Sequence, residues 1–244
     1  MFSINEQKAI ELGEAGIKAA SEGNEYIAIQ NIDYLRELGV ELIKEDFETE
    51  SKTVAVYIRN IGTKAAQKKF EEPANAAIGA LKELSEMALE KSYSNALWSL
   101  ARAVQEVGKG AAQFKIEVPA QKAVEALEMI GLGAVEKKME VVTLWTTLAL
   151  GEIDFIANEQ KLSEITAAAK ASREAIIKSS EEKGFVSREQ IEVYPKLISE
   201  TIKNFGAYQD LMPSSYPEKA NEAFNEETFF EEEAEDEEAE NKDK

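Results

Sequence analysis

The sequence predicts an all-α protein in which a stack of similar helices is followed by a helical C-terminal cap and a disordered acidic tail. Three observations lead to this prediction. Apolar residues recur with a period of 23 residues, their spacing within each period matches one face of an α-helix, and two prolines lie two periods apart. We therefore expect a helical-repeat solenoid at 1–165, capping helices at 166–217 and a tail at 218–244.

The repeat is clearest in five segments that align without a gap. The segments begin at residues 28, 51, 74, 97 and 120. The eighth position of each segment is aliphatic and the twelfth is small. These positions hold Leu35, Ile58, Leu81, Val104 and Leu127, and Gly39, Gly62, Ser85, Gly108 and Gly131, respectively. Weaker copies on both sides extend the pattern to about seven units between residues 5 and 165.

Each repeat is predicted to be one helix followed by a turn. At 100° per residue, the apolar positions 4, 5, 8, 11, 12, 15 and 16 fall within an arc of about 140°. Position 19 would point into that arc but is polar in every copy, so the helix should end near position 17 or 18. The recurring glycine lies on the buried face, which favours close helix crossing. The alternative is a phosphate-binding loop at 108–110 or 131–133, but neither segment has the P-loop spacing.

The prolines indicate that two helices form the larger unit. Pro73 and Pro119 both occupy the last position of a repeat, and proline is favoured in the first turn of a helix. This gives pairs of 46 residues at 28–73, 74–119 and 120–165. Helix pairs of this length resemble HEAT and armadillo repeats. The resemblance implies a right-handed α-α superhelix with an extended concave surface for other molecules.

The cap is predicted from helical patterns that leave the 23-residue register. Residues 160–183 form an amphipathic pattern that ends at Gly184, and Ser187 and Gln190 have the spacing of a capping box. Pro195 should kink or divide the helix that follows.

The helix at 143–157 is apolar on all sides, so we expect the cap to cover it. An exposed patch that binds a partner is the alternative.

Composition excludes several kinds of site. The chain has neither Cys nor His, which removes thiolate nucleophiles, disulfides, imidazole bases and Cys/His zinc sites. It opens without the pattern of a signal peptide and has no apolar run of membrane-spanning length. We therefore expect a cytoplasmic, non-enzymatic protein with no catalytic residues, cofactor, metal site or membrane contact.

Surface charge points to a binding surface on the second helix of each pair. Outward positions of the second helices in the first two pairs hold five basic residues and one acidic residue. In the superhelices that the sequence resembles, these helices usually line the concave face. We therefore expect a locally basic groove with a tryptophan at its middle. The predicted partner-binding residues are Lys52, Arg59, Lys64, Trp98, Arg102, Lys109 and Trp145.

A second set of lysines lies at the predicted helix C-termini, where positive charge offsets the helix dipole. They are Lys44, Lys68, Lys69, Lys91, Lys115, Lys137, Lys138 and Lys161. This row could also hold an anionic polymer or the tail at 218–244, which carries 13 acidic residues against 3 basic ones. Phe229 and Phe230 would anchor such a docked tail, and a tail that only improves solubility is the alternative.

These patterns favour a protein-interaction scaffold that binds a protein or an acidic peptide. The alternative is a HEAT-like nucleic-acid-binding protein or a DNA-glycosylase-like enzyme. The resemblance to such glycosylases implies an aspartate and aromatic residues in a basic cleft, for which Asp154 and Trp145 are the candidates. Because the chain without its tail has a net charge of −9, binding to nucleic acid is not expected.

Overall fold

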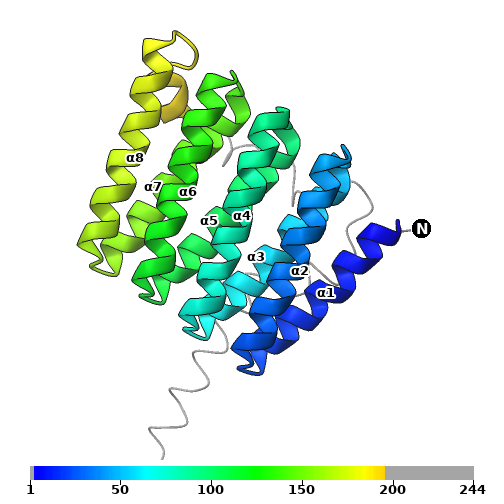
Figure 1. The fold of residues 1–244 in the computed structure, drawn as a ribbon. Coiled ribbons are helices and arrows are strands. Elements are labelled where there is room, and N and C mark those ends of the chain that lie inside the picture. Colours follow the sequence, from blue (N-terminus) through cyan, green and yellow to red (C-terminus); the bar gives the residue numbers. More distant parts are fainter. Residues whose placement is uncertain (1–2, 196–244) are drawn as a thin grey trace, which may run out of the picture. The chain divides into compact units, whose positions relative to one another are not determined.

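The structure is a computed structural model that describes residues 3–195. This range contains eight long helices and a shorter helical segment from residue 188 to 195, and no strand (Figure 1). The long helices are α1 (Ile4–Ser21), α2 (Glu25–Lys44), α3 (Glu48–Gln67), α4 (Glu71–Lys91), α5 (Ser94–Gln113), α6 (Glu117–Glu136), α7 (Glu140–Glu159) and α8 (Ser163–Glu182). The predicted all-α class is confirmed. The expected tail at 218–244 and the part of the cap after residue 195 lie outside the described range.

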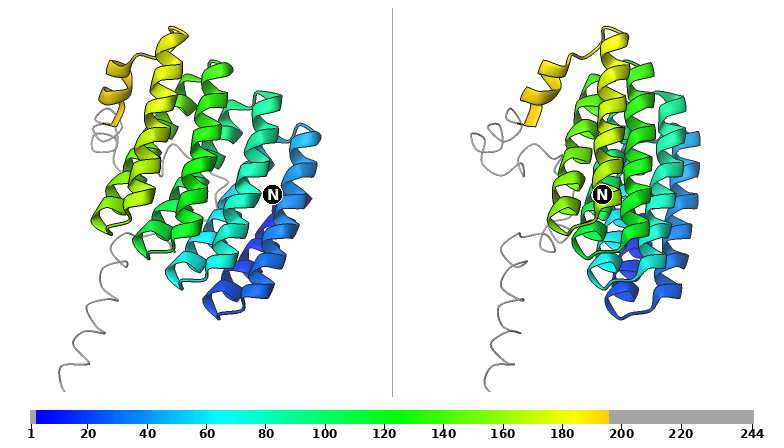
Figure 2. Two further views of the ribbon diagram at one scale, coloured as in Figure 1. Left: turned by 60° about the vertical axis from the view of Figure 1, so that its left-hand side comes forward. Right: turned by 90° about the vertical axis from the view of Figure 1, so that its left-hand side faces the viewer.

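The helices form two layers, with the odd-numbered helices in one and the even-numbered helices in the other (Figure 2). Each helix packs on the next helix in the chain and on the next but one, so α3 contacts α1, α2, α4 and α5. Figure 1 shows the even-numbered layer in front of α3, α5 and α7. This is the packing of an α-α repeat superhelix, in which each unit touches only its neighbours.

Seven consecutive helices begin 23 residues apart, which confirms the repeat period. The series runs from α2 at Glu25 to α8 at Ser163. Pro73 and Pro119 fall in the first turns of α4 and α6, as expected. Since α8 keeps the register and packs on α6 and α7 like the earlier helices, the repeat continues one helix beyond the boundary expected at residue 165.

The six turns from α2 to α8 share one geometry, set by the polar residue at position 19. This residue has a left-handed backbone with φ between 55° and 65°. The next residue donates its N–H to the carbonyl five residues earlier, as Phe70 does to Ala65 at 2.8 Å. Such a Schellman turn satisfies the last carbonyls of the helix, so each helix ends where the pattern predicts. The left-handed residues are Asp46, Lys69, Ser92, Lys115, Lys138 and Lys161.

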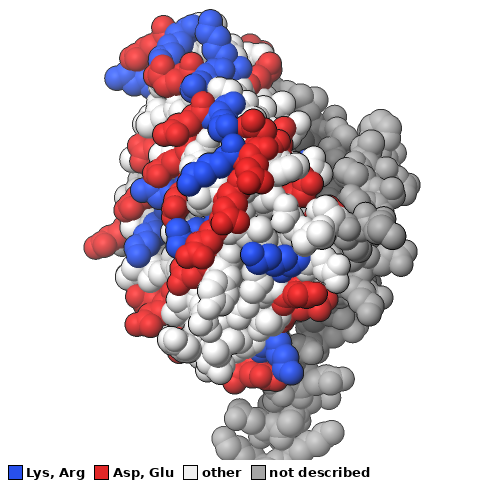
Figure 3. Space-filling view, turned by 45° about the vertical axis from the view of Figure 1, so that its right-hand side comes forward, with Lys and Arg blue, Asp and Glu red and all other residues white. Residues whose placement is uncertain are grey.

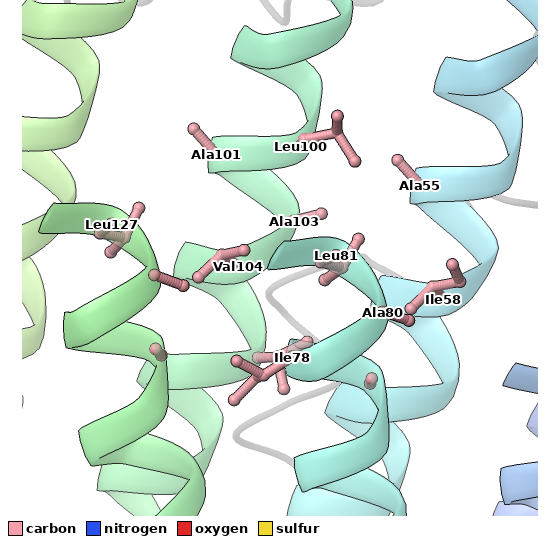
Figure 4. Packing of buried hydrophobic residues seen from close by; sticks show 14 of the residues in the cluster. Ala55, Ile58, Ile78, Ala80, Leu81, Leu100, Ala101, Ala103, Val104 and Leu127 are labelled. Atoms are coloured by element: carbon pink, nitrogen blue, oxygen red, sulfur yellow. The ribbon is translucent and has the colours of Figure 1, made fainter. Parts of the chain in front are cut away.

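The recurring glycine brings adjacent helices into close contact, as predicted. A Cβ atom added to Gly62 would lie 2.6 Å from Ala77 Cβ, and one added to Gly108 would lie 2.5 Å from Ala123 Cβ. Figure 4 shows the aliphatic core between these helices, in which Ile58 of α3 is fully buried.

The two glycine-rich segments at 108–110 and 131–133 lie inside α5 and α6. Their backbone N–H groups belong to helices, so neither segment forms a phosphate-binding loop.

The lysines at the helix C-termini do not form a single row. Successive helices run in opposite directions, so consecutive turns lie at opposite edges of the stack (Figure 1). The lysines of α2, α4 and α6 therefore lie at one edge, and those of α3, α5 and α7 at the other. The two groups are Lys44, Lys91, Lys137 and Lys138, and Lys68, Lys69, Lys115 and Lys161.

Polar contacts join neighbouring turns at the first of these edges. Lys91 Nζ lies 2.7 Å from Asp46 Oδ1, and the Tyr93 hydroxyl donates a hydrogen bond to the same carboxylate. The hydrogen bonds from Lys91 and Tyr93 lower the pKa of Asp46, and the bond to Asp46 raises the pKa of Tyr93 to about 12. Further along this edge, Lys183 pairs with Glu136.

The first residues of the cap cover only one end of α7. Val186 and Ile191 pack on Leu144 of α7 and Ile177 of α8 in a small separate core. The predicted capping box is present, because Ser187 N donates to Gln190 Oε1 at 2.9 Å and Gln190 N donates to Ser187 Oγ at 3.3 Å.

Within the helix predicted at 143–157, coverage is uneven. Leu144 is 8% exposed, Trp145, Leu148 and Ile156 are partly buried, and Phe155 keeps 63% of its surface exposed.

Candidate binding surface

All seven predicted partner-binding residues lie on the odd-numbered layer. Positions 2, 6, 9 and 13 of a repeat line one side of a helix, because steps of three and four residues return to the same face. In α3, α5 and α7 they form three stripes of different chemistry: polar and basic on α3, aromatic and basic on α5, and apolar on α7. The stripes are Lys52, Val56, Arg59 and Thr63; Trp98, Arg102, Gln105 and Lys109; and Leu144, Leu148, Gly151 and Phe155.

The structure brings three of the predicted residues into one cluster. The rings of Trp98 and Trp145 meet edge to face, with centroids 5.4 Å apart. The guanidinium carbon of Arg102 lies 6.0 Å from the centroid of Trp98, at the limit of a cation-π contact. All three side chains are partly buried, so they are held in place but still reach the surface.

Beside this cluster, Lys109 is neutralised by carboxylates. Its Nζ lies 3.0 Å from Glu152 of α7 and 3.9 Å from Glu106 of its own helix. Glu152 also accepts a hydrogen bond from Gln105 Nε2 at 2.6 Å. The surface between α5 and α7 is therefore mixed in charge, whereas we expected it to be basic.

The remaining predicted residues lie on α3 and are spread along that helix. Arg59 donates two hydrogen bonds to Asn60 Oδ1, at 2.9 and 3.0 Å. Lys52 and Lys64 are about 18 Å apart along the helix axis at 1.5 Å per residue. Lys52 of α3 and Trp98 of α5 occupy the same position in their repeats. Arg59 and Lys64 lie about two and three turns further along α3.

The even-numbered layer has charges of both signs in close contact. Arg36 lies within 4 Å of three carboxylates, at distances of 3.8 Å from Asp33, 3.7 Å from Glu37 and 3.2 Å from Glu83. On the face shown in Figure 3, acidic and basic side chains likewise lie next to each other. The outward positions of α2, α4 and α6 hold more acidic than basic residues, in contrast to the cations of α3 and α5.

A groove on α7 lies on the helix for which an exposed patch was the alternative prediction, but Arg173 and Pro195 were not expected in it. It has a volume of about 490 Å³ and is lined by Lys109, Thr147, Leu148, Gly151, Glu152, Phe155, Ile156, Arg173 and Pro195. Two sequence signals point to it. Leu148, Phe155 and Ile156 are apolar at outward positions, and Arg173 occupies position 8, which is aliphatic in every earlier repeat.

The structure does not bring Asp154 and Trp145 together. Nine residues separate them on α7, which places them on opposite sides of the helix, about 14 Å apart along its axis. Trp145 packs on Trp98, and Asp154 forms an ion pair of 3.7 Å with Lys170 of α8. The two candidates therefore do not form one site on this helix.

Within residues 3–195, no cluster of three or more acidic side chains is placed to hold a metal ion. Among the same residues, none of the helices combines the length and the apolarity needed to cross a bilayer.

Comparison with known proteins shows the fold alone. No family model and no curated protein matches the chain. Among solved structures, the chain is similar to one titled DHF91 filament, with 17% identity and a TM-score of 0.57, over 71% of this chain and 98% of that one. It is also similar to a DHF46 filament, with 14% identity and a TM-score of 0.57, over 72% of this chain and 98% of that one. The likeness is that of consecutive helices packed as a repeat.

Proposed function

We propose that this protein is a non-enzymatic interaction scaffold of HEAT/armadillo type, which binds an acidic segment of a partner protein across α3 and α5. The observation that carries the proposal is the cluster of Arg102, Trp98 and Trp145, in which the two rings meet edge to face and Arg102 lies over Trp98. Trp and Arg are enriched among the residues that dominate binding energy at protein interfaces. Here they are preorganised by contact with one another, so little side-chain entropy remains to be lost on binding.

The positive charges on α3 and α5 support an acidic partner on this surface. Lys52 and Arg59 of α3 lie on the same side of the layer as Arg102 of α5. The carboxylates of Glu106 and Glu152 lie near Lys109, at the other end of the α5 stripe. At the Trp98 end, the Glu48 carboxylate accepts a hydrogen bond from Ala96 N at 3.0 Å. Arg102 lies over Trp98 there, so a partner's carboxylate placed near this ring would meet a cation.

The test uses tryptophan fluorescence, because Trp98 and Trp145 are the only tryptophans in the chain. The probe is a synthetic peptide, Glu-Glu-Thr-Phe-Phe-Glu-Glu-Glu, which has the sequence of residues 226–233. The receptor is the full chain with both Phe229 and Phe230 changed to Ser, so that its own copy of this segment does not compete.

We expect a saturable fluorescence change whose Kd rises at least tenfold in Arg102→Gln and rises with salt. Lys178→Gln removes one positive charge from α8 and serves as the control, with a Kd within twofold of the receptor's. No saturable change at millimolar peptide contradicts the proposal. Binding of a short DNA duplex with a steep salt dependence would instead support the nucleic-acid alternative.

The tail lies outside the described residues, so its docking stays a hypothesis from the sequence. The same titration tests it. Weaker peptide binding by the natural chain than by the Phe229→Ser, Phe230→Ser receptor would support a tail that competes for the surface, and equal binding would contradict it.

A further inference from the structure

The groove on α7 differs from the matching surface of the other odd-numbered helices. Position 13 is Thr63 in α3 and Lys109 in α5 but Phe155 in α7, and position 9 is Arg59 and Gln105 but Gly151. Gly151 has no side chain to fill the groove, and Phe155, which also lines it, keeps 63% of its surface exposed.

The position of α7 in the stack explains why this surface is open. Among the described helices, α1, α3 and α5 each pack on the next odd-numbered helix, whereas α7 is the last of its layer. Of the described cap residues that follow α8, Val186 and Ile191 pack on Leu144 at the start of α7, and Pro195 lines the groove. The side of α7 that an additional helix would cover therefore remains as a groove of about 490 Å³, a size typical of ligand-binding pockets.

Two cations line the groove, and within residues 3–195 only one of them forms an ion pair. Lys109 and Glu152 neutralise each other at 3.0 Å. Arg173 also lines the groove, with its Nε 4.0 Å from the place of a Cβ on Gly151. Among residues 3–195, Arg173 forms no hydrogen bond and no ion pair. The lining therefore places a cation beside apolar side chains.

We propose that the α7 groove anchors a partner peptide in which a bulky apolar side chain stands next to a carboxylate. The apolar side chain lies over Gly151 between Leu148 and Phe155, and the carboxylate pairs with Arg173. This inference rests on the proposed function, since it adds an anchor site for the same class of acidic partner. It also explains why an apolar and a basic surface adjoin on one layer.

The test uses the same receptor and the same peptide, with variants confined to the groove. Gly151→Leu fills the floor, and Arg173→Gln removes the unpaired charge. We expect each to raise the Kd at least fivefold, while Lys178→Gln leaves it within twofold. A control peptide with both Phe residues replaced by Ser should bind more weakly and should not respond to Gly151→Leu. Circular dichroism confirms that each variant keeps its helix content.

The outcomes separate the two proposals. If Arg102→Gln weakens binding but Gly151→Leu and Arg173→Gln do not, the scaffold function stands and the groove is not its anchor. If the groove variants alone weaken binding, the anchor stands and the surface at Trp98 is not used. If the peptide does not bind at all, both proposals fail.

A second measurement identifies the occupant of the groove. The chain contains no cysteine, so Phe155→Cys and Val141→Cys each introduce a single thiol, and both positions are more than half exposed. In the free receptor, we expect the two thiols to react with a thiol reagent at similar rates. The bound peptide should slow the reaction of the thiol at 155 and leave the reaction at 141 unchanged. If, in the free receptor, the thiol at 155 reacts at least tenfold more slowly than the thiol at 141, the chain itself fills the groove. That result would overturn the proposal.

Discussion

Trp98 and Trp145 stand edge to face with ring centroids 5.4 Å apart, and this contact joins α5 to α7 at the surface of the odd-numbered layer. Such aromatic pairs contribute about 0.5–1.5 kcal/mol beyond the area that they bury. We therefore predict a coupling free energy of this size from a double-mutant cycle with Trp98→Leu and Trp145→Leu, measured by urea unfolding. A coupling near zero would mean that the rings only touch and do not stabilise one another.

The glycines of the repeat should respond to substitution in opposite ways. Gly79 lies in α4 with no atom within 4 Å of an added Cβ, so Gly79→Ala should stabilise the protein by about 0.5–1 kcal/mol. Gly62→Ala should destabilise it by about 1–3 kcal/mol, because the new Cβ would lie 2.6 Å from Ala77 Cβ. Thermal unfolding of both variants measures the contrast, and a shift of the same sign in both would refute the close-crossing role of Gly62.

The left-handed residues at position 19 cost conformational energy that glycine would avoid. Lys138 has φ of 55°, while the preceding Lys137 has φ of −89°. We predict that Lys138→Gly stabilises the protein by about 1 kcal/mol, since a left-handed backbone costs a side-chain-bearing residue about 1–2 kcal/mol.

Lys137→Gly is the matched control for this substitution. It removes the same charge at an adjacent exposed position with an ordinary φ, so it should be neutral or destabilising. Equal effects of the two substitutions in urea unfolding would argue against strain at position 19.

The contact between Asp46, Lys91 and Tyr93 should make stability depend on pH at both extremes. The pKa of Asp46 is lowered from 3.8 by its hydrogen bonds, so its contribution is present above that value and is lost as the pH falls through the lowered pKa. The pKa of Tyr93 is raised from 10.0 to about 12, so its contribution is present below pH 10 and is lost as the pH rises towards 12.

Two conservative variants separate these contributions. Asp46→Asn keeps a residue that tolerates a left-handed backbone, and Tyr93→Phe removes only the hydroxyl. The difference in melting temperature between the natural chain and Asp46→Asn should shrink below pH 3.8, and the difference for Tyr93→Phe should shrink above pH 10. Differences that stay constant over these ranges would show that the two groups do not titrate with folding.

Glu152 should restrain the affinity of the surface for acidic ligands. It neutralises Lys109 at 3.0 Å, so Glu152→Gln frees one positive charge. We predict that this variant binds the acidic peptide about two- to fivefold more tightly, as expected for one partly exposed charge. Fluorescence titration measures the change, and unchanged or weaker binding would place the peptide away from Lys109.

Much of the fold follows from the sequence because the repeat imposes the same local rules in every copy. The aliphatic residue at position 8, the glycine at position 12 and the polar residue at position 19 predict the buried face, the close crossing and the helix end. All three agree with the structure, as Ile58, Gly62 and Lys69 show in α3. The 23-residue period also predicts which helices pack together. It leaves only a short turn between consecutive helices, so they must be adjacent and antiparallel.

The candidate site was predictable only in its residue types. Trp98, Arg102 and Trp145 were chosen from outward positions, and the structure adds that they touch. Their contact depends on how far α7 is displaced from α5, which is a property of packing within the odd-numbered layer. The same displacement places Glu152 of α7 beside Lys109 of α5. Arg173 of α8 also lines the groove, which its sequence position alone did not indicate.

The sequence by itself determined the class, the period, the helix ends and the side of each helix that is buried, because these depend on contacts within one repeat or between adjacent repeats. Only the tertiary structure decided which charges neutralise each other, which aromatic rings touch and where a groove opens. Those features depend on distances between side chains from helices that are far apart in the sequence. A 23-residue pattern repeats without encoding such distances.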